Sequence, residues 1–418
     1  MRRSLLTILL VISTIVAAIA ADPTATTYPW SDCQGSAKPY PTPRQAYDYP
    51  DTLTPVMINH VGRHGARFPA TPKHTATLLK ALDNAEKAGT ITARGRELKK
   101  IANTVTELSN GRWGALDSLG IAEQRGIASR MYAGYPKLFS RGQVNAISSY
   151  APRCIMSMYE FCHQLSRLDN KVEINTASGR RYSPLMRFFD GDKEYTELRK
   201  SGALTSPLDD FMTQTIPLAP LKRVLGDKYP FDESANDIAM AEYSVLAGLS
   251  AIEMECDITR FFTPEEYNAL WSVFNLRQYL QHAASTVSAI PADIASPLLL
   301  NLINTTDAFI SGDKNIAPVN LRFGHAETLM PLLSLMHLQG CYYLTNYLDT
   351  VALHWRDFAI VPMAANLQMI LFRSDSGKYY LRVDLNETPV PLIPNDDAIY
   401  QPWTTARQYL ERCIPLYY

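Results

Sequence analysis

The 418-residue chain lacks most of the features that would assign it to a specialised class of protein. It has no low-complexity tract and no internal repeat, which argues against fibrous and solenoid architectures. Its formal net charge is only −1, so it has no global positive field with which to attract nucleic acid. We therefore expect a globular protein, of a size that allows two domains, whose affinity for any anion comes from a local pocket.

The chain also lacks a Cys-x-x-Cys pair, which argues against a zinc ribbon or a thioredoxin-like redox site. Disulfides in an oxidising compartment are compatible with its six cysteines, although the sequence does not define which of them would pair. These cysteines are Cys33, Cys154, Cys162, Cys256, Cys341 and Cys413.

The N-terminus has the three parts of a secretory signal peptide. Met1-Arg2-Arg3 is positive, residues 5–17 are almost wholly apolar, and Ala18-Ile19-Ala20 has the small-x-small form of a cleavage site. A membrane anchor is the alternative, but the run is short for a span of about 20 residues. We predict a signal peptide at 1–21 and no membrane span after cleavage. The mature protein would be secreted or extracytoplasmic: periplasmic in a bacterium, or in a lysosome-like compartment.

Two sequons predict glycosylation if the host is a eukaryote, because the Asn-x-Thr pattern is the acceptor for N-linked glycans. They are Asn304-Thr305-Thr306 and Asn386-Glu387-Thr388.

A cluster of positive charge follows the first apolar run that reads as a strand, residues 56–58: it is the stretch Arg63-His64-Gly65-Ala66-Arg67-Phe68-Pro69. Guanidinium groups offer planar forks of donors that match phosphate oxygens. An imidazole is an uncharged nitrogen nucleophile near neutral pH, and Gly65 would let the backbone approach an anion. The alternative is a surface loop with two solvated arginines.

Two further segments repeat the pattern of a strand followed by polar residues. Residues 319–323 read as a strand and precede His325 and Glu327, and residues 143–147 read as a strand and precede Arg153. In α/β sheets, ligands gather at the carboxyl ends of strands. We therefore expect these three segments to meet at one edge of a sheet.

The first stretch contains the full RHGxRxP pattern and resembles the histidine acid phosphatases, a branch of the histidine phosphatase superfamily that works outside the cytoplasm. Most members of that branch carry His-Asp downstream. His325-Ala326-Glu327 is instead similar to the multiple inositol polyphosphate phosphatases. The resemblance is strong at 60–69 and 321–331 and thin between about 167 and 300.

The resemblance implies a set of site residues. His64 would be the nucleophile that forms a phosphohistidine, and Glu327 would donate a proton to the leaving alkoxide. Arg63, Arg67, Arg153 and His325 would bind the phosphate being cleaved, and Lys73 is a candidate contact to another phosphate. No cofactor or metal is expected, because the arginines would neutralise the phosphate. His60 and His64 have the spacing of a zinc pair, but that spacing converges only on a helix.

The expected fold is α/β, with a mainly parallel sheet flanked by helices and an inserted, mostly α-helical domain. The predicted parts are an α/β domain at 22–166, the insertion at 167–300, and the rest of the α/β domain at 301–418. Helices are predicted at 235–262, 264–284 and 403–412, and a β-hairpin joins 367–373 to 379–385. Candidate contacts to outlying phosphates in the insertion are Arg180, Arg181, Lys193, Lys222 and Arg223.

The predicted function is hydrolysis of a small polyphosphorylated substrate, with no nucleic-acid partner. The resemblance implies phytate and lower inositol phosphates, with 2,3-bisphosphoglycerate as a side activity. Three alternatives stay open at this point: an acid phosphatase of broad specificity, a mutase that returns the phosphoryl group to its substrate, and a non-catalytic protein that binds phosphate esters.

Overall fold

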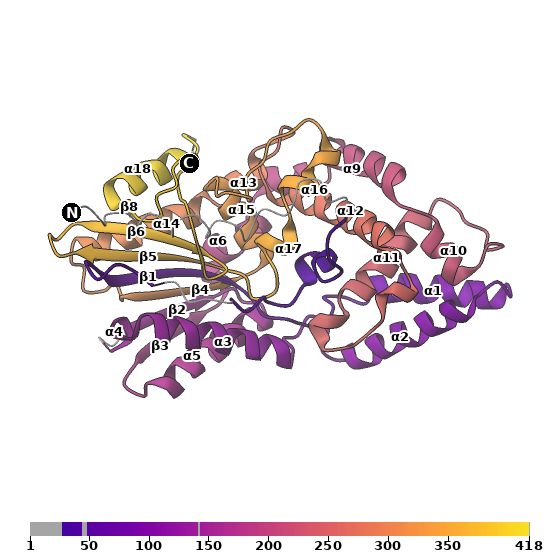
Figure 1. Ribbon diagram of the computed structural model, residues 1–418, viewed down its shortest axis with the longest axis horizontal. Helices are drawn as coiled ribbons and strands as arrows, with labels where there is room; N and C mark the ends of the chain where they lie inside the picture. The colour runs from indigo at the N-terminus through magenta and orange to yellow at the C-terminus, as the bar shows by residue number, and fades with distance from the viewer. Residues whose placement is uncertain (1–26, 44–47, 141–142, 418) are drawn as a thin grey trace, which may run out of the picture.

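The computed structural model describes residues 27–43, 48–140 and 143–417 (Figure 1). The predicted signal peptide at 1–21 lies outside the described residues and stays a prediction. Within the described part, the chain forms a central sheet covered by helices on both faces, with a group of helices extending to one side (Figure 1).

The sheet has the strand order β3-β2-β4-β1-β5-β6-β7, and β8 pairs with β6. The strands β3, β2, β4 and β1 pair in parallel, whereas β1-β5, β5-β6, β6-β7 and β6-β8 are antiparallel. Their bounds are β1 Leu53–Arg63, β2 Gln143–Ser148, β3 Glu173–Ser178, β4 Val319–Gly324, β5 Asn366–Ser374, β6 Tyr379–Leu385, β7 Thr388–Val390 and β8 Gln401–Pro402.

The fold is thus mixed α/β, and the expectation of a mainly parallel sheet is wrong for its second half. The predicted hairpin is confirmed as β5 and β6, and its tight turn accounts for one of the antiparallel pairs, because two strands joined in this way must run antiparallel. Gly377 has φ +82 in that turn, a conformation that glycine adopts at little cost.

Helices cover both faces of the sheet (Figure 1), and each face buries its own set of apolar side chains beneath them. Ile58 and Phe323 pack toward α3 Ser118–Gly134, α4 Pro136–Phe139 and α5 Pro152–Leu168. Met57 and Val61 face the opposite way, toward α14 Ser296–Ile310 and α15 Ala326–Leu335, as the alternation of a strand dictates. The predicted C-terminal helix is confirmed as α18 Trp403–Cys413.

The second group of helices lies on the right of Figure 1 and draws on two parts of the chain. It contains α1 Lys73–Lys87 and α2 Ala93–Ser109, together with α9 Gly202–Thr215, α10 Ala219–Leu225, α11 Ala235–Ala247 and α12 Pro264–His282. A Cβ at Gly95 of α2 would lie 2.0 Å from the Val224 carbonyl oxygen of α10, so only glycine permits this packing.

Shorter helices connect these elements. They are α6 Ser183–Met186, α7 Phe188–Gly191, α8 Lys193–Leu198, α13 Ile290–Asp293, α16 Val351–His354 and α17 Asp357–Ile360, with 3-10 turns η1 Asp32–Ala37, η2 Arg180–Tyr182, η3 Leu249–Ile252, η4 Ile258–Arg260 and η5 Leu348–Thr350.

The helix expected at 235–262 ends early, at Ala247, and Glu253 then adopts a left-handed conformation with φ 54. The helix expected at 264–284 is confirmed as α12, which starts with a capping box between Thr263 and Glu266. The division into three parts stays a prediction, although β3 joins the sheet from within 167–300.

Candidate functional site

The three predicted segments meet at the carboxyl ends of the parallel strands. Arg63, the last residue of β1, lies opposite Gly324, the last residue of β4. The His64 amide donates to the Gly324 carbonyl at 3.1 Å, and the Ser149 amide, just after β2, donates to the Phe323 carbonyl at 2.9 Å. The ring centroids of His64 and His325 are consequently 5.8 Å apart.

Hydrogen bonds to side chains of α5 and α3 hold the backbone of the loop after His64. The Gly65 amide donates to Ser157 Oγ of α5 at 3.1 Å, and the Ala66 amide donates to Glu123 Oε2 of α3 at 2.7 Å. A Cβ at Gly65 would lie 2.4 Å from the Gly120 carbonyl oxygen. Glycine is therefore required here by the backbone of α3, and its role in letting the backbone approach an anion stays a prediction.

His64 is buried, with 2% of its surface exposed, and it is oriented as a nucleophile would be. Its Nδ1 lies 2.9 Å from the Gly65 carbonyl oxygen. A carbonyl only accepts, so Nδ1 carries the proton and Nε2 keeps its lone pair. Burial, reinforced by Arg63, Arg67 and Arg153, holds the pKa of His64 well below its ordinary value, so the ring is neutral in mildly acidic solution.

Three arginines surround this neutral ring without carboxylate partners. Arg63, Arg67 and Arg153 form no ion pair with any described carboxylate, and the buried Nε of each has no hydrogen-bond partner among the described residues. Burial and the neighbouring guanidiniums lower the pKa of Arg67 to about 9, and burial lowers that of Arg63 to about 10. The site therefore concentrates positive charge that an anion would neutralise.

Two of the arginine side chains are held to backbone carbonyls. Arg63 Nη1 donates to the carbonyls of Ser36 and Val361, each at 2.6 Å, and Arg67 Nη1 donates to that of Phe68 at 2.9 Å. These contacts fix the guanidinium planes before any ligand arrives, which lowers the entropy cost of binding.

His325 is held between the guanidiniums of Arg153 and Arg187, and no sequence motif predicts the second of them. Arg153 Nη2 lies 3.2 Å from its Nδ1, and Arg187 Nη1 lies 2.8 Å from its Nε2, which also contacts Ser149 Oγ at 2.9 Å. Burial, with these arginines, lowers the pKa of His325 to about 3. A neutral imidazole has one lone pair and cannot accept from both arginines. A bound anion would satisfy the remaining donors.

Arg187 comes from the loop between α6 and α7, inside the range predicted as an insertion. Its guanidinium packs over the rings of Tyr150 and Phe189, each 5.0 Å from the centroid, and pairs with Asp190 at 2.6 Å. No motif surrounds it in the sequence, so only the tertiary contact with His325 identifies it.

Glu327 lies in the first turn of α15, where the helix N-terminus favours negative charge. Burial would raise the pKa of its carboxyl, but His282, His325 and Arg63 together lower it to about 2. The group is a carboxylate in the free protein. A dianionic ligand entering the arginine cluster would raise its proton affinity.

The other candidates lie outside this cluster. Lys73 is exposed at the first residue of α1, and its side chain contacts none of the described site residues. Arg180 stacks over the Tyr150 ring at 4.6 Å, close to Arg187, whereas Arg223 forms an ion pair with Glu266 at 2.8 Å. The remaining three insertion candidates make no contact with the cluster in the described part of the chain.

The expected disulfides are absent: all six cysteines, each within the described residues, are free thiols. Four of them are buried in separate places, and burial raises the pKa of Cys33, Cys154, Cys162 and Cys341 to about 12. The Cys154 thiol donates to the Gly324 carbonyl at 3.0 Å, next to His325, so it packs the site instead of crosslinking the chain.

The two sequons differ in their surroundings. Asn304 is exposed on α14. Asn386 has φ 50, and its Nδ2 donates to the carbonyls of Ala359 and Ile360 at 3.0 and 3.2 Å. A glycan on Asn386 would replace one of these amide hydrogens, so the structure favours Asn304 of the two.

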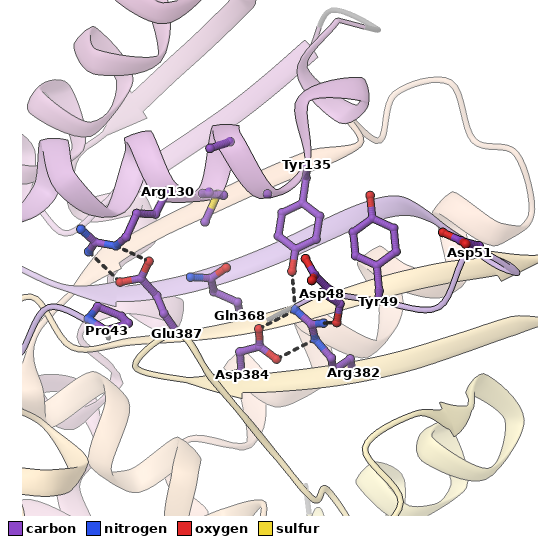
Figure 2. Close-up of a pocket in the computed structure, with 13 residues that line it drawn as sticks. Pro43, Asp48, Tyr49, Asp51, Arg130, Tyr135, Gln368, Arg382, Asp384 and Glu387 are labelled. Atoms are coloured by element: carbon purple, nitrogen blue, oxygen red, sulfur yellow. Dashed lines mark hydrogen bonds and ion pairs between the residues drawn. The ribbon is translucent and has the colours of Figure 1, made fainter. Parts of the chain in front are cut away.

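A cavity of about 610 Å³ lies elsewhere, between α3 and the strands β5 and β6 (Figure 2). Its charged groups face one another: Arg382 pairs with Asp384 at 2.9 Å, and Arg130 pairs with Glu387 at 2.7 Å (Figure 2). None of the candidate site residues lines it. Its cations are already neutralised, so we do not assign it the phosphate chemistry.

Residues 56–386 match the family described as the histidine phosphatase superfamily, branch 2. The multiple inositol polyphosphate phosphatase 1 of Homo sapiens is 26% identical over 380 residues, covering 83% of this chain and 77% of the human protein. Its counterpart from Gallus gallus is 25% identical over 376 residues, covering 84% and 80%.

Among solved structures, the multiple inositol polyphosphate phosphatase of Bifidobacterium longum in complex with inositol hexasulfate has a TM-score of 0.78 at 17% identity, covering 92% of this chain and 99% of its own. The phytase from D. castellii has a TM-score of 0.72 at 15% identity, covering 92% and 85%. At such identities the structural likeness shows the fold. Within the described residues, no helix combines the length and apolar character needed to cross a membrane.

Proposed function

Because the chain belongs to branch 2 of the histidine phosphatase superfamily, we propose that it is a phosphoric monoester hydrolase that removes phosphate groups from inositol polyphosphates through a phosphohistidine at His64. The observation that carries this proposal is the ring of three unpaired arginines around a buried, neutral imidazole. Such a ring is costly to the free protein and is relieved by a phosphate.

In the first step the arginines hold the oxygens of one phosphate, with His325 as a further hydrogen-bonding group. His64 Nε2 attacks phosphorus in line, and the bond from phosphorus to the ester oxygen breaks with its electrons on that oxygen. Glu327, protonated once the dianion occupies the site, gives its proton to the departing alkoxide.

In the second step Glu327 is a carboxylate and takes a proton from water. The water oxygen attacks phosphorus, the bond between phosphorus and His64 Nε2 breaks, and inorganic phosphate leaves. The low pKa of His64 suits this second step, because the released imidazole stays neutral and does not take the proton that Glu327 accepts from water.

The substrate class rests on the relatives, both multiple inositol polyphosphate phosphatases by name, and on cations beyond the cluster. Arg187 and Arg180 border the site from the helical region, and Lys73 is exposed at the start of α1. These groups suit a substrate that carries phosphates besides the one being cleaved. Phytate, lower inositol phosphates and 2,3-bisphosphoglycerate fit this description, and the predicted signal peptide would place the reaction in the secretory route.

The test is phosphate release from phytate and from 4-nitrophenyl phosphate by wild type and His64→Ala, with acid-quench trapping of phosphoenzyme. We expect the variant to lose about 10⁴-fold or more in kcat and all phosphoenzyme, because the nucleophile is gone. EDTA should leave the wild-type rate unchanged. Equal kcat/KM on both esters would favour an acid phosphatase of broad specificity. Tight phytate binding without any turnover would overturn the proposal.

A further inference from the structure

We propose that Asp357 is a positioning residue for Arg63: its carboxylate ties η1 to α17, so that the backbone carbonyls of Ser36 and Val361 meet at the Arg63 guanidinium. This inference rests on the proposed function, because it assigns a support to one of the arginines that would hold the phosphate. Asp357 is the first residue of α17 and lies outside both the RHGxRxP pattern and the His-Ala-Glu pattern.

The Arg63 guanidinium uses one of its nitrogens as an anchor. Nη1 carries two hydrogens, and it donates to the carbonyls of Ser36 and Val361, each at 2.6 Å. The buried Nε has no hydrogen-bond partner among the described residues. Nε and Nη2 form a fork of parallel donors, which matches two oxygens of a phosphate. The two carbonyls therefore set the direction of this fork without occupying it.

Asp357 contacts the residues that supply both carbonyls. The Ser36 amide donates to Asp357 Oδ2 at 2.6 Å, although the two residues are 321 positions apart. The Val361 amide donates to the backbone carbonyl of Asp357 at 2.8 Å, within the turn that α17 makes. The side chain of Asp357 thus holds the first support of Arg63, and its backbone holds the second.

The Asp357 carboxylate is itself fixed by the helical region. It is fully buried, with 0% of its surface exposed. Its Oδ1 accepts from Trp271 Nε1 at 2.9 Å, and its amide donates to Asn275 Oδ1 at 2.9 Å. Both partners lie on α12 and are fully buried as well. Burial raises the pKa of Asp357 to about 6, so the group is a carboxylate at pH 7 and both of its oxygens accept.

The residue before Ser36 leaves room for this carboxylate. Gly35 has φ +58, and a Cβ at this position would lie 2.8 Å from Asp357 Oδ2. A glycine adopts this backbone conformation at little cost and lets the oxygen reach the Ser36 amide. The close approach of η1 to Asp357 therefore depends on the sequence at two adjacent positions.

The arrangement orients Arg63 without neutralising it. A carboxylate in direct contact with a guanidinium competes with phosphate for the same donors. The oxygens of Asp357 instead accept from two neutral donors, the Ser36 amide and the Trp271 indole. Arg63 is held only by carbonyls, which carry no net charge, so its own charge stays available to an anion.

The test is a double-mutant cycle of Asp357→Leu and Arg63→Gln at pH 7, measuring kcat/KM on phytate and on 4-nitrophenyl phosphate. Leucine has a similar shape but accepts no hydrogen bond. Asp357→Leu should lose about 10- to 100-fold on both esters, because Arg63 would hold the phosphate common to both and is now misplaced. In the Arg63→Gln background the same change should cost less than about 2-fold, since no guanidinium is left to position.

Asp384→Leu is the matched control, because Asp384 is also a buried aspartate with a pKa raised to about 6, and its partner Arg382 lies outside the site. It should lose stability but keep the wild-type kcat/KM per folded molecule. Gly35→Ala is the second variant in case Asp357→Leu does not fold: its methyl group would push against Oδ2 and leave the charge of Asp357 in place. It should show a smaller loss that again disappears in the Arg63→Gln background.

Losses of equal size with and without Arg63 would show that Asp357 supports only the fold, and they would overturn the inference. A loss confined to phytate would do the same, since both esters present the phosphate that Arg63 would hold. If instead the wild type released no phosphate from either ester, the proposed function itself would have failed.

Discussion

Two groups of buried arginines in this molecule differ in how their charge is balanced. Arg382 lies in the cavity of Figure 2 between both oxygens of Asp384 and the hydroxyl of Tyr135. Burial would lower its pKa, but Asp384 and Tyr135 raise it. Arg67 has no such partner, and its pKa is lowered. A compensated arginine supports the fold, whereas an uncompensated cluster is stable only as a preformed site for an anion.

The largest effect should come from breaking the compensated pair. Arg382→Gln leaves Asp384 buried without its cation and should lower the free energy of unfolding by about 3–5 kcal/mol. Burial is the main reason that the pKa of Asp384 is raised to about 6. Protonation of Asp384 should therefore make the loss in free energy of unfolding smaller at pH 5 than at pH 8. Urea unfolding at both pH values measures this.

The control for that pair is the double change Arg382→Met with Asp384→Leu, which removes both charges and should recover much of the stability. The kcat per folded molecule should stay at the wild-type value in both proteins. A large loss of kcat in Arg382→Gln would mean that the cavity belongs to the reaction after all.

The converse change is Arg67→Gln, in the uncompensated cluster. It should cost about 10²–10³-fold in kcat/KM, the effect of removing one donor that stabilises developing charge. It should also raise the melting temperature, because a guanidinium repelled by Arg63 and Arg153 is gone. Activity assays test the expected loss in kcat/KM, and thermal unfolding of the same preparation tests the expected rise in melting temperature. A less stable variant would contradict the idea that this cluster strains the free protein.

Inorganic phosphate should act on the two clusters differently. At about 100 times its Kd it should stabilise the wild type by about 2.7 kcal/mol, since it binds only the folded state. Arg382→Gln should keep this gain, and Arg67→Gln should lose most of it. Thermal unfolding with and without phosphate, with chloride at equal ionic strength as the control, distinguishes site binding from general screening.

A smaller effect is expected at Glu242, a fully buried carboxyl on α11 whose oxygens have no hydrogen-bond partner among the described residues. Burial raises its pKa to about 8 from an ordinary value of 4.5. The folded protein therefore holds a proton that the unfolded chain has lost, and stability falls as pH rises from about 4.5 through about 8.

Glu242→Gln removes that dependence and should raise the free energy of unfolding by about 1–3 kcal/mol at pH 8, with little change at pH 4. Denaturant unfolding as a function of pH is the measurement. A constant difference between the two proteins over this range would show that Glu242 does not titrate on unfolding.

The site residues that are adjacent along the chain could be predicted from local sequence patterns. Arg63, His64 and Arg67 share one loop, and His325 and Glu327 share another, so a local pattern of charge and apolar residues was enough to find them. The strands β1, β2 and β4 were predicted for the same reason, because their apolar runs are local. Their meeting at one sheet edge followed from the rule for parallel strands.

The side chains that join these residues from distant parts of the chain could be identified only in the folded protein. Arg187 contacts His325 across 138 positions, and Asp357 meets the Ser36 amide across 321, and no local period encodes such pairs. The fold also keeps the six cysteines apart as free thiols, contrary to the expectation of disulfides. Local sequence fixes backbone preference and the chemistry available, whereas burial, charge balance and proton affinity depend on neighbours that the folded chain alone brings together.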